Sequence, residues 1–123
     1  MSEFDRYHIH KDVKFGPAEL FDISSLAAEV GDEWFNQTLA SVNDCVVRFA
    51  VMEGDFHWHK HDNEDELFYV IDGHLLIDLE NETLDLSPKQ AVVIPRGMQH
   101  RPRAPERSVI LMFEGSGIEP TGD

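Results

Sequence analysis

Short apolar runs of strand length alternate with turn residues through most of the chain after residue 33. Such runs, bounded by Gly, Pro, Asn, Asp or Ser and repeated at fairly regular spacing, are typical of a β-sandwich or barrel. The pattern therefore predicts an all-β fold. The predicted strands are Trp34–Ser41, Cys45–Met52, Phe56–His61, Glu66–Ile71, His74–Leu79, Thr83–Leu86, Ala91–Ile94, Gln99–Arg103 and Ser108–Phe113.

Turn residues indicate how several of these strands follow one another. Asp72-Gly73 joins two strands in two residues, and because Gly and Asp tolerate positive φ, this dipeptide predicts a tight hairpin. Glu80–Glu82 and Ser87–Lys89 mark further reversals, and Pro95–Gly97 ends an apolar run sharply.

One short helix is predicted ahead of the strands. Ser24–Gly31 begins with a hydroxyl residue suited to capping, continues with helix formers and ends on glycine. We therefore divide a single domain into a flanking segment (residues 1–33), a barrel (34–114) and a C-terminal tail (115–123). The chain ends, Met1–Tyr7 and Gly115–Asp123, are polar or glycine-rich and are expected to pack poorly unless a partner subunit covers them.

Composition narrows the class of protein. A chain of 123 residues, 41% of them hydrophobic, can form one compact core. Ten Lys and Arg against 24 Asp and Glu give a formal net charge of −14, which would repel a phosphate backbone and argues against a nucleic-acid partner. Cys45 is the only cysteine, so no internal disulfide forms. No apolar segment is long enough for a signal peptide or a membrane span, so we expect a cytoplasmic protein without membrane association.

Four side chains in this chain have the spacing of metal ligands. His59 and His61 alternate along a predicted strand and can therefore point to the same face. Glu66 begins the next strand after a polar turn, and His100 follows the Pro-x-Gly-x-x-His element that starts at Pro95. The alternative is a set of solvent-exposed histidines beside one of many acidic residues. The carboxylate at a fixed offset and the downstream element favour a metal site.

Imidazole and carboxylate ligands suit one divalent transition metal such as iron, manganese, nickel, zinc or copper. Thiolates, which favour closed structural zinc sites, are absent from this set. Four protein ligands leave one or two positions of an octahedral ion open for water, oxygen or a substrate, which indicates chemistry more than scaffolding.

These residues resemble the two sequence motifs of the cupin superfamily. The first motif is represented by Gly54, His59, His61, Glu66 and Gly73, and the second by Pro95, Gly97 and His100. The resemblance implies a double-stranded β-helix, or jelly-roll barrel, with a metal held inside by His59, His61, Glu66 and His100. The stretch from Trp58 to Val70 is similar to small single-domain cupins described as mannose-6-phosphate isomerase-like. Two positions depart from the motif, with Lys89 in place of a glycine and Ala104 in place of an asparagine.

Three further residues are candidates for function. His57 shares a strand face with the two histidines that follow it and can be a fifth ligand, a catalytic proton carrier or a hydrogen-bonded interior residue. Arg48 interrupts an apolar strand and either anchors an acidic substrate inside the barrel or reaches solvent from an edge. Gln99, beside His100, can donate a hydrogen bond to a substrate or a metal ligand.

Two predicted strands, starting at Glu66 and Ser108, are apolar on both faces and therefore need cover on both. One face can line the barrel, and a second subunit can cover the other, which predicts a homodimer. Trp58, which is expected to point outward, would belong to that cover.

Two functions are compatible with the predicted site. The first is a metal-dependent enzyme acting on a small oxygen-bearing molecule, acidic or sugar-like, with dioxygenase chemistry favoured by iron and isomerase or other Lewis-acid chemistry favoured by zinc or manganese. The second is a non-catalytic module that binds or senses a small-molecule ligand.

Overall fold

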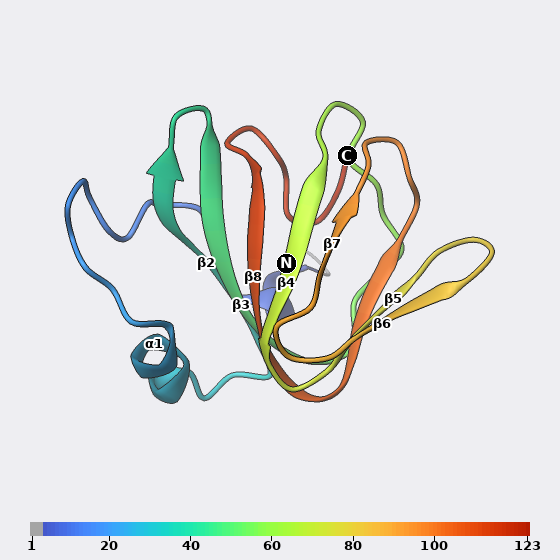
Figure 1. The fold of residues 1–123 in the computed structure, drawn as a ribbon, viewed down its shortest axis with the longest axis horizontal. Helices are drawn as coiled ribbons and strands as arrows, with labels where there is room; N and C mark the ends of the chain where they lie inside the picture. Colours follow the sequence, from blue (N-terminus) through green and yellow to red (C-terminus); the bar gives the residue numbers. More distant parts are fainter. Residues whose placement is uncertain (1–3) are drawn as a thin grey trace.

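The structure is a computed structural model and describes residues 4–123. One eight-stranded sheet, folded on itself, forms the body of the molecule, with a single α-helix beside it (Figure 1). The elements are η1 (Asp5–Tyr7), β1 (Ile9–His10), α1 (Ile23–Glu29), β2 (Trp34–Val42), β3 (Cys45–Asp55), β4 (Glu66–Asp72), β5 (Leu75–Asp78), β6 (Thr83–Leu86), β7 (Ala91–Ile94) and β8 (Arg101–Gly115). Among the described residues, no helix is long and apolar enough to span a membrane.

Strand β8 organises the sheet. The strand order is β1-β2-β3-β8-β4-β7, and the β5–β6 pair joins the start of β8. Residues 105–107 of β8 stand opposite Glu53 alone, and this bulge bends the strand so that its two halves belong to different parts of the sheet (Figure 1). The predicted all-β jelly-roll barrel with one short helix is thereby confirmed.

Two clusters of buried side chains stabilise this arrangement. Ala50 and Met52 of β3 point into the barrel, where they pack with residues from β4, β5, β7 and β8. Phe49 and Val51 alternate with these two residues, so they point to the outer face of the sheet, where they pack with Ala27 of α1. Alternation along one strand thus supplies both the interior of the barrel and the contact with the helix.

The turn at Gly73 is present, but the predicted hairpin is wrong. Gly73 has φ +87°, yet β4 pairs with β7 and β8, whereas β5 pairs with β6 and β8. Ser108 explains the separation, since its Oγ accepts from the His74 amide (2.8 Å) and donates to the His74 carbonyl (2.9 Å). The chain therefore passes from one part of the sheet to the other at this turn.

Some predicted boundaries also differ. The predicted strand Phe56–His61 is largely irregular, because β3 ends at Asp55 and only His59 forms an isolated bridge, with His100. The two late strands predicted from Gln99 and Ser108 are one continuous strand. The helix begins after Asp22, whose carboxylate accepts from the Ser25 amide (2.9 Å), and not after the predicted hydroxyl cap.

The expectation of poorly packed chain ends is wrong for the described residues; Met1, Ser2 and Glu3 lie outside them. Tyr7 and Ile118 are only 2% and 3% exposed, respectively. Near the C-terminus, the Asp123 amide donates to the Lys60 carbonyl (2.9 Å) and an Asp123 carboxylate oxygen accepts from the Asp62 amide (2.7 Å). Both ends therefore pack against the barrel of their own chain.

Candidate metal centre

The four predicted ligands come from three places in the sequence and meet inside the barrel. His59 and His61 lie in the irregular segment after β3, Glu66 is the first residue of β4, and His100 immediately precedes β8. Two backbone hydrogen bonds between His59 and His100, of 3.0 and 2.9 Å, hold these two segments together. All four side chains are buried, and one potential ligand atom from each lies within 4.8 Å of the others.

A hydrogen bond from the ring to a backbone carbonyl orients two of the three imidazoles. Nδ1 of His59 donates to the His57 carbonyl (3.0 Å), and Nδ1 of His100 donates to the Met98 carbonyl (2.9 Å). Because a carbonyl can only accept, each neutral ring carries its proton on Nδ1 and keeps Nε2 as a lone-pair donor.

Unpaired polar atoms face one another at the centre of the cluster. Nε2 of His61 and Nε2 of His100 lie 3.3 and 3.6 Å from Oε1 of Glu66, and none of these three atoms has a hydrogen-bond partner. Buried lone pairs without donors carry a substantial desolvation cost that a cation would offset. The residues present therefore fit a divalent metal ion.

The environment also favours the protonation states that metal binding requires. Burial, reinforced by the neighbouring His100, lowers the pKa of His59 to about 3, so its imidazole is neutral at pH 7. Burial alone would raise the pKa of Glu66, but the adjacent Glu114, His100 and His61 side chains outweigh burial and hold it well below its usual range. The cluster thus presents a neutral imidazole and a charged carboxylate, as a metal site needs.

Glu114 belongs to this site and was missed in the sequence analysis. It faces Glu66 across the β4–β8 ladder and is 3% exposed. Burial and the neighbouring charge of Glu66 raise the pKa of Glu114 well above its usual range, although Arg48 opposes this effect. Alternation along β8 was the available signal, because Glu114 follows Ile110 and Met112 on the interior face.

Arg48 is buried and contacts Glu114. Its side chain points into the barrel, with Nε 2.5 Å from Oε1 of Glu114, and the alternative in which the guanidinium reaches solvent is wrong. Arg48 also lies near the C-terminal segment, since one of its terminal nitrogens donates to the Ile118 carbonyl (3.4 Å). The cation is thus engaged by groups of its own chain.

His57 and Gln99 are not among the four clustered ligands, although the centroids of the His57 and His59 rings are 5.1 Å apart. Nε2 of His57 donates to the Thr121 carbonyl (2.6 Å), and its Nδ1 accepts from the Tyr7 hydroxyl (3.2 Å). Both ring nitrogens are therefore occupied in linking the two chain ends. Gln99 lines a surface hollow formed with residues 79–82 and 95–98.

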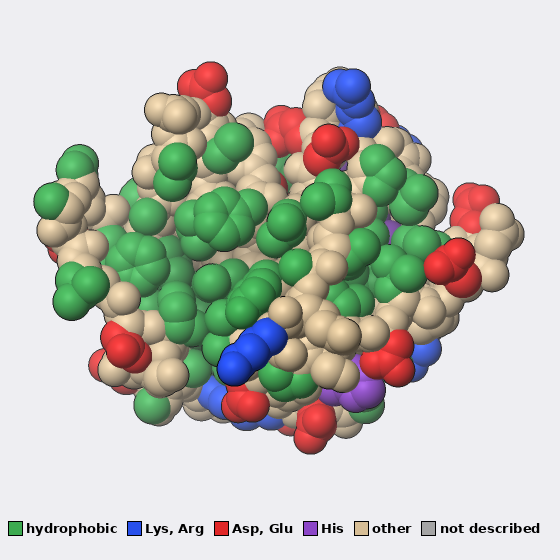
Figure 2. Space-filling view, viewed as in Figure 1, with side chains coloured by type: hydrophobic (Ala, Val, Ile, Leu, Met, Phe, Trp, Pro, Cys, Tyr) green, Lys and Arg blue, Asp and Glu red, His purple; other side chains and the backbone are tan. Residues whose placement is uncertain are grey.

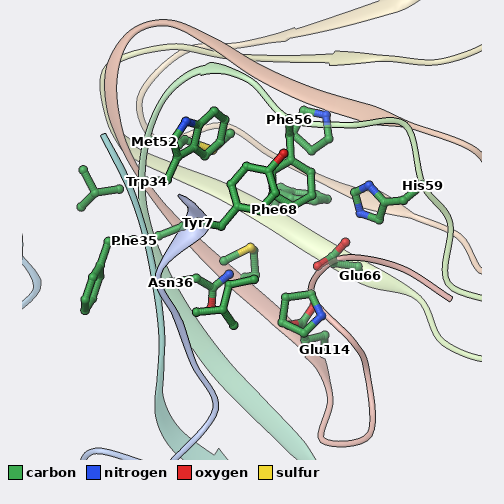
Figure 3. A pocket seen from close by; sticks show the side chains of 16 residues that line it. Tyr7, Trp34, Phe35, Asn36, Met52, Phe56, His59, Glu66, Phe68 and Glu114 are labelled. Carbon is green, nitrogen blue, oxygen red and sulfur yellow. The ribbon is translucent and has the colours of Figure 1, made fainter. Parts of the chain in front are cut away.

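A cavity adjoins the ligand cluster inside the barrel (Figure 3). It measures about 520 Å³ with its open mouth included, and His59, Glu66 and Glu114 line one side of it. Aromatic and other apolar side chains line most of the remainder. Pro120 from the C-terminal segment also contributes to the wall, so both chain ends help to enclose this space.

The fold is a jelly-roll barrel, and three imidazoles and one carboxylate converge inside it. These features place the protein in the class of barrels that carry a candidate metal centre in their interior. The chain belongs to the cupin superfamily, since residues 45–114 match the family model described as Cupin domain.

Relatives and solved structures agree with this assignment. The chain is 39% identical over 103 residues to "Uncharacterized protein YdbB" of Bacillus subtilis, a match that covers 83% of this chain and 91% of that protein. It is 42% identical over 63 residues to "Polyketide synthase CurC" of Streptomyces cyaneus, covering 50% of this chain and 41% of that protein. A crystal structure of a cupin-2 domain containing protein from Shewanella frigidimarina superposes with a TM-score of 0.75 at 29% identity, covering 78% of this chain and 94% of that chain.

Proposed function

We propose that this protein binds one divalent transition-metal ion through His59, His61, Glu66 and His100 and uses the open positions of that ion to bind a small oxygen-bearing molecule. The observation that carries this proposal is the set of buried, unpaired atoms, Nε2 of His61, Nε2 of His100 and Oε1 of Glu66, that face one another. Iron, manganese, nickel, zinc and copper all suit these ligands.

A bound ion would supply Lewis-acid or redox chemistry to an oxygen-bearing ligand. The chain itself orients the ligands, since the His57 and Met98 carbonyls fix two imidazoles and Glu114 flanks Glu66. Dioxygenase chemistry with iron, or isomerase chemistry with zinc or manganese, is the reaction class that we propose for an enzyme.

A non-catalytic binding module is the second candidate. The observation that favours it is the position of His57, whose two ring nitrogens are both hydrogen-bonded and which lies outside the walls of the cavity. Incubating the metal-loaded protein with small hydroxy, keto and catecholic acids separates the two functions. Turnover supports the enzyme, whereas reversible binding without turnover supports the module.

Elemental analysis of the purified protein tests the metal site. We expect about one ion per chain in the wild-type protein and in His74→Ala, a matched control that removes an imidazole outside the cluster. We expect His61→Ala to lose the ion. Retention of a full equivalent of metal by His61→Ala would contradict the proposed site.

We also propose that the protein is a homodimer that acts in the cytoplasm. Apolar side chains gather on the outer face of the sheet (Figure 2), where Phe113 (45% exposed) and Val93 (51% exposed) flank Leu67 in one cross-strand row. Exposed apolar patches of this kind mark association surfaces, and an isologous contact lets a second copy cover the same patch. Light scattering after gel filtration should give a dimer for the wild-type protein and a monomer for Phe113→Asp.

A further inference from the structure

The cavity beside the metal cluster has an aromatic wall. Four of the aromatic residues that line it come from four separate segments and are Tyr7, Trp34, Phe56 and Phe68. The Tyr7 ring lies 4.4 Å from Phe56 and 5.1 Å from Trp34, measured between centroids. Figure 3 shows these rings on one side of the space and His59, Glu66 and Glu114 on the other. The wall is therefore an assembled surface that faces the candidate metal ligands.

This aromatic wall reaches the metal ligands directly. The Phe56 ring lies edge-on to His59 with centroids 5.2 Å apart, and the Phe68 ring lies edge-on to His100 at 6.1 Å. A molecule whose oxygen atoms occupy open positions on the ion would therefore extend its remaining atoms against aromatic side chains. Planar rings gain contact area and favourable quadrupole interactions in such surroundings.

The cavity lining offers no protein cation to a charged group on the part of a ligand that lies away from the metal. Among the described residues that line it, none is Lys or Arg, and its acidic residues are Glu66 and Glu114. Arg48 lies close by but contacts Glu114. A bound ion could pair with anionic oxygen donors of a ligand, but the rest of the ligand would find no protein cation in this lining. The lining thus suits a ligand whose atoms beyond the metal-bound oxygens are uncharged, with the Asn36 side chain as an uncharged polar contact.

We propose that the ligand of this site carries an aromatic ring next to its metal-chelating oxygen atoms and no charge apart from those oxygen atoms. This inference rests on the proposed metal site and replaces the acidic or sugar-like ligand expected from sequence. The oxygen atoms bind the ion, and the ring lies against Tyr7, Phe56 and Phe68.

A matched pair of chelators tests this proposal by calorimetry on the protein carrying the metal with which it is isolated. Acetohydroxamic acid and benzohydroxamic acid bind metals through the same two oxygen atoms, but only the second carries a phenyl ring. We expect benzohydroxamic acid to bind at least tenfold more tightly, a difference of about 1.4 kcal/mol. Malonate, a dianion with two oxygen donors, should bind more weakly than benzohydroxamic acid.

Two variants connect this preference to the cavity. Phe56→Ala removes part of the aromatic wall, and Ala50→Leu fills the space from β3 while keeping the barrel interior apolar. Both should reduce the preference to about threefold or less, and because the preference is a ratio of two affinities, a change in metal coordination shared by both chelators cancels. Trp58→Ala is the control, since Trp58 is 46% exposed and lies outside the walls of this cavity, and it should keep the preference.

The possible failures are distinguishable. A wild-type protein that binds no metal overturns the proposed function and, with it, this inference. A protein that holds its metal but prefers benzohydroxamic acid by less than twofold, or that binds malonate more tightly, overturns the inference alone. If neither cavity variant folds, as judged by circular dichroism, the wild-type affinities still decide.

Discussion

Arg48 and Glu114 contact each other inside the barrel, with Nε 2.5 Å from Oε1 and side chains only 3% and 0% exposed. Glu114 also faces the metal-ligand candidate Glu66 on the neighbouring strand. One guanidinium therefore contacts the second of two adjacent buried carboxyl groups. When one member of a buried ion pair is removed, the remaining charge has no partner. The loss of stability is then larger than when both members are replaced by apolar residues.

We predict that Arg48→Met destabilises the metal-free protein by about 3–5 kcal/mol, because the buried carboxyl group of Glu114 then lacks its cation. The double variant Arg48→Met with Glu114→Met should recover much of that loss, since the second substitution removes the unpaired group. Urea unfolding of the wild-type protein, both single variants and the double variant measures the coupling. A loss below about 1 kcal/mol in Arg48→Met would show that the contact contributes little.

The depressed pKa of His59 predicts acid sensitivity of the metal-free protein. His59 takes up a proton near its ordinary pKa of 6.5 when unfolded but only near pH 3 when folded. The unfolded state therefore binds more protons within this window, and stability falls as the pH falls from 6.5 towards 3. The full contribution is present above pH 6.5. Between pH 7 and pH 5 this single group should remove about 2 kcal/mol.

Urea unfolding at pH 7 and pH 5, with the metal removed by a chelator, measures this effect. His59→Gln is the matched variant, because an amide of similar size does not titrate. Its stability should change by about 2 kcal/mol less than that of the wild-type protein over the same interval. Equal changes in the two proteins would mean that His59 is not the group responsible.

His57 connects the two ends of the chain, through Tyr7 on one side and Thr121 on the other. We predict that His57→Phe keeps its metal and speeds hydrogen exchange at the Gly122 and Asp123 amides about tenfold, because the ring no longer anchors this segment. Amides in the middle of β3 should exchange at the wild-type rate. Loss of metal from His57→Phe would contradict this prediction.

Gly73 is required by its backbone conformation and by its surroundings. It has φ +87°, and an added Cβ would lie 2.7 Å from the Arg107 carbonyl oxygen and closer still to Ser108 Oγ. We predict that Gly73→Ala destabilises the protein by about 2–4 kcal/mol. Gly31→Ala, at a position with open space around the added Cβ, should change stability by less than about 1 kcal/mol. Thermal unfolding of both variants compares them directly.

The candidate metal ligands were predictable because imidazole and carboxylate residues lie at short intervals in the sequence. His59, His61 and Glu66 lie within one short segment, and His100 follows a turn element that can be identified on its own. Imidazole and carboxylate groups at such intervals have few other uses. Their convergence was therefore predictable from residue type and spacing, with the cupin resemblance adding the barrel, although the segment that holds His59 and His61 is largely irregular and not the predicted strand.

The residues that surround the ligand cluster are brought there by the pairing of strands. The spacing of residues in the sequence does not reveal this pairing. Glu114 contacts Arg48 and Glu66 only because β8 lies between β3 and β4, and nothing local in the sequence specifies that order. The central position of β8 also explains why no hairpin forms at Gly73. The turn was predicted correctly, but both flanking strands pair with β8. Tyr7 could not be assigned to the cavity for a similar reason, since its contacts with Phe56 and His57 join positions far apart in the chain.

The central position of β8 also determines when the molecule can fold. Strands β3, β4 and β5 all pair with it, although it follows every one of them in sequence. Their edges remain open until residues beyond 100 have been synthesised, so assembly requires long-range closure, which is intrinsically slow. His100 directly precedes β8, and the candidate metal centre is therefore completed in the same late step as the barrel.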